Sequence, residues 1–412
     1  MWTSSATTCW SRSRRPEPLS PDPRSGVPVI THTKAFGCFL PPFHDPSVSP
    51  HASLKRDIEL CGLVDDLGFD EIWLGEHHSS GWSTLSSPEM LMAALARETR
   101  RIHFATGVIP LPYHHPLHVA ERIVLLDHLT AGRAILGVGT GTYVHDMEMI
   151  GVDPASVRDH FRAALATVQA LLNGETVNTT TPWFTAKKAV LQLQPLRGAG
   201  AIETVVASSL SPAGIELLTD TATTPTVHVA PPWGSIRPGM DPDPVGALTE
   251  RVESYRNKSA GGTRVRCNVF VHIADSPAAG VEELLEGFSA LRRGLYRNTL
   301  GMPIPDSPVA HRKTLQNLVD TGGFIVGDAA TCAARIRDLL DRVGDPVSLN
   351  FFVPRWVSHQ ATLEQLTGLA HEVLPALTGG YDGTTESIRL TSEEAARQLK
   401  SRTELVGNGG DK

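Results

Sequence analysis

The chain has 412 residues, of which 41% are hydrophobic and 20% are charged, and this composition excludes a disordered chain. Its formal net charge is −7 and its basic residues form no single stripe, which argues against nucleic acid as a partner. No apolar run approaches the roughly 18 residues that a membrane span needs, and no secretory signal opens the chain. We therefore expect a cytoplasmic protein with no membrane partner.

Both ends of the chain are expected to lie outside the folded domain. Residues 1–33 are rich in Ser, Pro and Thr and are predicted to be a disordered extension. A transit peptide is the competing interpretation, although the stretch has no amphipathic apolar face. Residues 379–412 are polar and are predicted to be a disordered tail with at most one short helix. Residues 34–378 then form one domain, in which scattered cysteines without a CxxC pair indicate neither disulfides nor zinc.

Within this domain, short apolar runs alternate with amphipathic stretches, a pattern typical of parallel β/α units. The predicted strands are residues 35–40, 71–75, 102–109, 134–138, 204–207, 226–229, 264–273 and 348–353. The predicted helices cover residues 53–67, 117–129 and 157–172, begin at Pro88 and Pro212, and end with one that finishes near Leu377. Eight such units predict a (β/α)8 TIM barrel, with an open doubly wound sheet as the disfavoured alternative.

Three segments do not fit a plain repeat of strand and helix. Residues 175–202, after the fourth unit, are polar and Thr-rich and contain Trp183 and Phe184, so we expect a lid or a packed insertion. Residues 230–244, after the sixth strand, are rich in Pro and Gly and predict a loop at the active face. The run at 324–327 is expected within a helical stretch.

Glu76, His77 and His78 follow the second strand, and Trp82 lies just beyond them. The carboxyl ends of barrel strands carry the active site, so a histidine here is placed for proton transfer and Glu76 for orienting it. Glu76, His78 and Trp82 are expected to line the substrate or cofactor pocket. The alternative is a pair of structural histidines that bind loop carbonyls.

Tyr113, His114 and His115 open the helix after the third strand, with His118 one turn further on. Three histidines suggest a metal, but adjacent residues point apart and no third ligand accompanies His115 and His118. We therefore expect no metal here. We expect Tyr113, His114 and His115 to line a substrate or cofactor pocket.

Two further segments suggest cofactor contacts. Gly137, Gly139 and Gly141 do not match the dinucleotide fingerprint, because Thr142 replaces its third glycine, but they allow backbone to approach a flat ring. The run from Ser208 to Pro212 follows the fifth strand and opens a helix, where a phosphate could bind. A plain serine cap with proline in the first turn explains that run equally well.

Four segments together resemble the luciferase-like flavin-dependent monooxygenases of the bacterial luciferase family. They are GFDEIWLGEHH (68–78), ATGVIPLPYHHP (105–116), LLDHLTAGRAILGVGTG (125–141) and VVASSLSPAG (205–214). They occur in family order and at family spacing, and the likeness covers about residues 34–377. The longer stretches GEHHSSGWSTLSSPEM and LPYHHPLHVAERIVLLDHLTAGR are most similar to the limonene 1,2-monooxygenase-like branch.

The resemblance implies a barrel that binds reduced FMN (FMNH2), supplied by a separate NAD(P)H:flavin reductase. FMNH2 then reacts with O2 to a C4a-hydroperoxide that oxygenates an apolar organic substrate. Epoxidation, hydroxylation and Baeyer–Villiger oxidation all remain open, and secondary metabolism is the implied setting. Homodimers are common in the family, and one chain does not decide the point.

By this resemblance, His77 is the catalytic histidine. The residues implied in flavin binding are a cis peptide pair against the ring, two glycines beside the cofactor and two serines at its phosphate: Gly107, Val108, Gly139, Gly141, Ser208 and Ser209.

One departure keeps rival interpretations open. Luciferases carry a phosphate-binding arginine where this chain has Thr140, which keeps an F420-dependent hydride-transfer oxidoreductase of the same family as an alternative. A non-catalytic flavin-binding paralogue is a second rival, against which the intact His77 weighs. A generic barrel enzyme with a histidine cluster is the third.

Overall fold

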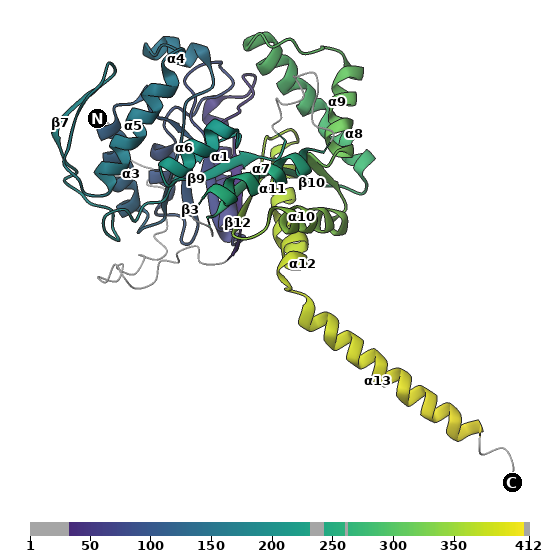
Figure 1. Ribbon diagram of the computed structural model, residues 1–412. Coiled ribbons are helices and arrows are strands. Elements are labelled where there is room, and N and C mark those ends of the chain that lie inside the picture. The colour runs from purple at the N-terminus through teal and green to yellow at the C-terminus, as the bar shows by residue number, and fades with distance from the viewer. Residues whose placement is uncertain (1–32, 231–242, 260–262, 408–412) are drawn as a thin grey trace, which may run out of the picture.

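Figure 1 shows a computed structural model of the chain, which describes residues 33–230, 243–259 and 263–407. Its centre is a closed ring of eight parallel strands in the order of the chain. They are β1 (Lys34–Leu40), β2 (Glu71–Leu74), β3 (His103–Thr106), β5 (Ala134–Gly139), β8 (Thr204–Ala207), β9 (Thr224–His228), β10 (Val265–Ile273) and β12 (Val347–Phe352). The predicted (β/α)8 barrel is confirmed.

Helices cover the outside of the ring (Figure 1). Those of the repeating units are α1 (Pro50–Asp66), α2 (Pro88–Leu95), α3 (Pro116–Leu129), α5 (Val157–Leu172), α6 (Pro212–Asp220), α7 (Pro244–Lys258), α10 (Ala329–Val343) and α11 (His359–Gly368). Additional helical segments are η1 (Leu111–Tyr113), α4 (Val144–Ile150), α8 (Pro277–Leu291), η3 (Arg292–Thr299), α9 (Pro308–Asp320), η4 (Leu369–Val373) and α12 (Leu374–Thr378). Proline in the first turn begins many of these helices, and Ser276 and Asp328 accept hydrogen bonds from the first-turn amides of α8 and α10.

The third predicted strand, residues 102–109, is divided into β3 and a short β4 (Ile109–Pro110). At the break, the hydroxyl of Thr106 donates to the carbonyl of Gly137 at 2.7 Å and accepts from its amide at 2.9 Å. A side chain at Gly137 would overlap the carbonyl oxygen of Thr106, so only glycine allows this approach.

Two predicted irregular or helical segments contain strands instead. Within residues 175–202, β6 (Val177–Thr180) and β7 (Thr185–Ala189) form an antiparallel hairpin. Residues 324–327, expected within a helical stretch, form β11 (Phe324–Gly327), which pairs with the second half of β10. That expectation was wrong because a buried run of four apolar residues has no periodicity that distinguishes strand from helix. Most of the predicted loop at 230–244 lies outside the described residues.

The expectation of a disordered C-terminal tail with at most one short helix is wrong for residues 382–407. These form α13 (Asp382–Gly407), a helix of 26 residues that extends away from the barrel in Figure 1. Ion pairs one turn apart, from Arg389 to Glu386 and Glu393, support it. Within the described parts of the chain, no helix has both the length and the apolar character that a membrane span requires. The predicted N-terminal extension lies almost entirely outside the described residues.

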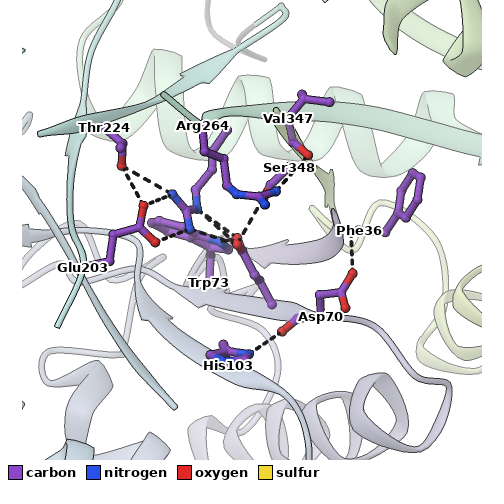
Figure 2. A network of polar contacts seen from close by, with 11 residues as sticks. Phe36, Asp70, Trp73, His103, Glu203, Thr224, Arg264, Val347 and Ser348 are labelled. Carbon is purple, nitrogen blue, oxygen red and sulfur yellow. Dashed lines mark hydrogen bonds and ion pairs between the residues drawn. The ribbon is translucent and has the colours of Figure 1, made fainter. Parts of the chain in front are cut away.

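A network of buried charges joins the amino-terminal ends of several strands (Figure 2). Arg266 of β10 is fully buried and donates to the carboxylate of Glu71 at 3.0 Å and to that of Glu203 at 2.7 Å. The indole of Trp73 and the hydroxyl of Ser348 also donate to Glu71. The two carboxylates raise the pKa of Arg266 against the effect of burial. Because this end of a barrel serves stability, we assign the network a structural role.

Replacement of Arg266 by Met should destabilise the protein by about 3–5 kcal/mol, because it leaves the carboxylate of Glu71 buried without its partner. Urea unfolding would show this as a lower midpoint. Adding Glu71→Gln should recover part of the loss, since the amide carries no charge. Equal midpoints for the wild-type protein and Arg266→Met would contradict the structural assignment.

Candidate active site

A cavity of about 280 Å³ opens at the carboxyl ends of the barrel strands. Strand ends and the loops that follow them supply its walls, and no single segment dominates. The lining residues are Phe39, Pro41, Pro42, Phe43, Gly75, Glu76, His77, Gly107, Val108, Pro110, Tyr113, Gly139, Thr140, Gly141, Thr142, Asp146, Ala207, Thr226, His228, Asn268 and Phe352. Seven residues predicted for the site are among them: Glu76, His77, Gly107, Val108, Tyr113, Gly139 and Gly141.

His77 is held in place from two sides at the edge of this cavity. Its Nδ1 lies 3.2 Å from a carboxylate oxygen of Asp146, and its ring stacks on Tyr143 with centroids 4.0 Å apart. Asp146 is buried, which raises its pKa, but hydrogen bonds from His77 and Ser79 outweigh burial and lower the pKa below its ordinary value. An ionised Asp146 requires the proton on Nδ1, so Nε2 of His77 is left as the acceptor.

Glu76 is buried between two histidines. One of its oxygens, Oε1, lies 2.8 Å from Nε2 of His78 and 2.6 Å from Nε2 of His114, and its other oxygen has no hydrogen-bond partner. Burial raises the pKa of Glu76, but the two histidines lower it further than burial raises it. The hydrogen bond to Glu76 raises the pKa of His78. Of the three residues, only Glu76 is among those that line the cavity, and the two histidines contact its Oε1.

Backbone rather than side chains forms one wall of the cavity. The peptide bond between Gly107 and Val108 is cis, as the family resemblance implied. A side-chain carbon at Gly139 would lie 2.7 Å from a methyl group of Val108, and one at Gly141 would overlap the hydroxyl of Tyr113. Gly141 also has a φ of +85°, which disfavours other residues. Glycine at these two positions therefore keeps this part of the cavity wall free of further side chains.

If a flavin binds in this cavity, as we propose below, Gly141→Ala should weaken its binding on the order of tenfold, because the new methyl group must push the ring of Tyr113 out of its place in the cavity wall. Gly151→Ala is the matched control, since Gly151 has a similar φ of +82° with open space around it. Both substitutions share a backbone cost of about 1–2 kcal/mol. Fluorescence titration with FMN would measure the difference, and equal affinities in the two variants would contradict this account.

Ser208 and Ser209 follow β8, but neither belongs to the described lining of the cavity, whereas Ala207 beside them does. The hydroxyl of Ser208 accepts from the amide of Leu210 at 3.0 Å. Ser209 is exposed, and Ser211 caps α6 by accepting from Gly214. The serines therefore flank the cavity at the start of α6 without forming its wall.

Trp82 and His115 lie away from the main cavity. Trp82 lines a neighbouring cavity of about 340 Å³, and Phe43 separates the two because it lines both. His115 caps α3 by accepting from the amide of Leu117, and its other ring nitrogen lies 3.4 Å from the carbonyl of Thr185 in the hairpin. The structure thus gives His115 a structural role in place of the predicted lining role.

Several cavity residues were not predicted from the sequence, above all Asp146 and His228. Asp146 follows His77 by 69 residues, and no local pattern links the two. His228 lies at the end of β9, where burial lowers its pKa to about 4. Its imidazole is therefore neutral near pH 7. Phe39 and Phe352 contact its ring and make this side of the cavity apolar. The position of His228 at the end of β9 was the only available signal for it, and Asp146, which lies on α4, had no such signal.

Comparison with known proteins places this geometry in a family. The model of the luciferase-like monooxygenases matches residues 35–345. The chain is 38% identical over 370 residues to a 4-hydroxyprotoasukamycin monooxygenase of Streptomyces nodosus subsp. asukaensis, covering 88% of this chain and 98% of the relative. It is 32% identical over 399 residues to a limonene 1,2-monooxygenase of Rhodococcus erythropolis, covering 90% and 98%.

A solved structure shows the same fold with a cofactor bound. It is the oxygenating constituent of 3,6-diketocamphane monooxygenase from Pseudomonas putida, a type II Baeyer–Villiger monooxygenase in complex with FMN. The TM-score is 0.66 at 22% identity, and the match covers 84% of this chain and 99% of that one. The chain belongs to the luciferase-like monooxygenases and is a flavin-dependent monooxygenase.

Proposed function

We propose that the protein is the oxygenase component of a two-component monooxygenase, in which FMNH2 from a separate NAD(P)H:flavin reductase binds in the main cavity. The observation that carries this proposal is the His77–Asp146 pair at the edge of a cavity with glycine-lined walls. The substrate would be an apolar organic molecule of secondary metabolism, consistent with the names of the two relatives.

The residues present fit a flavin. Gly107, Gly139 and Gly141 leave backbone exposed to a planar ring, and Phe39 and Phe352 supply apolar surface on another side. Ser208 and the amides at the start of α6 would hold the phosphate, together with Ser209. When bound, the reduced flavin would supply the two electrons that activate O2, so that one oxygen atom enters the substrate and the other leaves as water.

His77 would perform the proton transfer that oxygen activation needs. Asp146 fixes the proton on Nδ1, so Nε2 faces the reaction as a base and, once protonated, as a hydrogen-bond donor. Tyr143 stacks on the ring and limits its rotation. The apolar walls exclude water, which would otherwise release the oxygen as hydrogen peroxide.

A reduced deazaflavin of the F420 type is the second candidate cofactor. The specific observation is Thr140, which lines the cavity and donates to the carbonyl of Gly141, so this position supplies no cation for an FMN phosphate. With F420 the protein would transfer a hydride and would not use O2.

Isotope labelling tests the proposal. The protein would be incubated with FMN, a flavin reductase, NADH and isotopically labelled O2, with limonene and a cyclic ketone as probe substrates. The expected result is one labelled oxygen atom in a product, as an epoxide, an alcohol or a lactone. Two results together would favour the second candidate. With FMN, NADH would be consumed with hydrogen peroxide as the sole oxygen product for all probes. With reduced F420, the protein would transfer a hydride.

A further inference from the structure

The cluster of Glu76, His78 and His114 has a feature that oxygenation at His77 does not explain. Oε1 of Glu76 and the Nε2 atoms of the two histidines all lie within 4.8 Å of one another. They come from separate segments, the loop after β2 and the segment between η1 and α3. The second oxygen of Glu76 is buried and lacks a hydrogen-bond partner, which is costly for a carboxylate.

We propose that Glu76, His78 and His114 form a binding site for a divalent transition metal ion such as Zn2+. Two imidazoles and one carboxylate are a donor set that zinc and its neighbours in the first transition row prefer, and three protein ligands leave a position open for water. The sequence pointed to a different set, His115 and His118, which lacks a third ligand. The fold brings Glu76 to His114 instead, although 38 residues separate them.

The geometry needs only a small adjustment. Ligand atoms about 2.0–2.2 Å from a tetrahedral zinc ion lie roughly 3.4 Å apart. The present separations of 2.8 Å and 2.6 Å from Oε1 would therefore widen by less than about 1 Å. Both imidazoles are partly exposed, at 20% and 16% of their side chains, so they can move. The ion would replace the two protons that the histidines now donate to Glu76.

Arg122 opposes metal binding and thereby provides a sharp test. Its guanidinium lies 3.3 Å from Nδ1 of His114 and 3.1 Å from the carboxylate of Glu89. A histidine that binds a metal ion through Nε2 carries its proton on Nδ1 and donates that proton to an acceptor. The guanidinium of an arginine has only donors, so it cannot accept this hydrogen bond. Arg122 is 39% exposed and would turn toward Glu89 when the ion binds.

Glu76 and His78 flank His77 in the chain, and Glu76 lines the cavity. An ion held by these two residues would immobilise the segment that carries His77. The site would then be a point of inhibition by transition metals. Metal binding itself does not depend on the proposed flavin chemistry, so the two can fail independently.

The test measures Zn2+ binding to the flavin-free full-length protein by competition with a chromophoric chelator. The variants are Glu76→Gln, His78→Gln and His114→Gln, with His118→Gln as the matched control because His118 is an exposed neighbour outside the cluster. We expect one zinc ion per wild-type chain. Each cluster variant should lower zinc affinity on the order of 100-fold or more. Removal of a residue that only hydrogen-bonds to a metal ligand already lowers metal affinity by about 10–100-fold, and these variants remove the ligand itself.

Arg122→Gln should bind zinc more tightly than the wild-type protein, since the amide oxygen can accept the proton on Nδ1. Circular dichroism would establish that every variant is folded. With Co2+ as the probe, the visible absorption of a coordinated ion should appear in the wild-type protein and in His118→Gln and be absent from the cluster variants. The proposal would be overturned if the wild-type protein and all three cluster variants bound zinc with equal affinity. It would also be overturned if neither the wild-type protein nor Arg122→Gln bound zinc.

Discussion

His77→Ala should shorten the life of the oxygenated flavin and lower oxygenation by about 10²–10⁴-fold, the range that a positioned acid or base contributes. The reason is the position of His77, which lines the cavity, with its ring held by the hydrogen bond to Asp146 and by stacking on Tyr143. Rapid mixing of the FMNH2 complex with O2 would give the lifetime from flavin absorbance.

The control for this variant is His145→Ala. His145 is an exposed histidine on α4, and its interaction is a 3.4 Å contact with Glu148 at the surface. It should leave the flavin lifetime unchanged. A His77→Ala protein with the lifetime of the wild type would show that another group handles the proton, and His228 would then be examined first.

Asp146→Asn should lower oxygenation on the order of 10²-fold or more while leaving flavin affinity nearly unchanged. The amide can still approach Nδ1 of His77, but it also offers N–H groups, which favour the wrong tautomer. An Asp→Asn change behind the catalytic histidine of a serine protease costs about 10⁴-fold, which sets the upper bound. Single-turnover rates and FMN titrations would separate the two effects.

Glu148→Gln is the matched control for Asp146→Asn. It removes one negative charge from the same helix, but Glu148 is exposed and does not contact His77. A similar loss of activity in both variants would mean that net charge near the cavity matters and the hydrogen bond does not.

The pH dependence of stability gives Asp146 a second readout. Its folded-state pKa lies below the ordinary value of 3.8, so its hydrogen bonds add stability that is present above that pH. The contribution is lost as pH falls through the folded-state pKa. The melting temperature of the wild-type protein should therefore exceed that of Asp146→Asn at neutral pH, and the difference should shrink in acid below about pH 4.

Much of the fold could be predicted from the sequence because its signals are local. The strand at Thr204–Ala207 and the helices that begin at Pro88 and Pro212 lie where apolar runs, caps and prolines placed them. β11 could not be distinguished in this way, because four buried apolar residues fit either type of element. The length of α13 was missed because a polar composition was taken as a sign of disorder, although charged residues at helical spacing also support an exposed helix.

The candidate site was predicted in part, and its gaps have a common cause. His77, Glu76 and the glycine positions follow strands directly, so their place at one end of the barrel follows from topology. The pairs His77–Asp146 and Glu76–His114 join residues 69 and 38 positions apart, and such contacts depend on how neighbouring loops pack. His115 was assigned to the pocket with His114, but the beginning of α3 turns it toward the hairpin.

We propose that this cavity binds FMNH2 and controls its reaction with O2. The most direct measurement mixes an anaerobic complex of the protein and FMNH2 with oxygenated buffer in a stopped-flow spectrophotometer. We expect a long-lived oxygenated flavin that forms with the wild-type protein and decays far faster with His77→Ala. Oxidation of FMNH2 at the rate seen without protein, with no such intermediate, would contradict it.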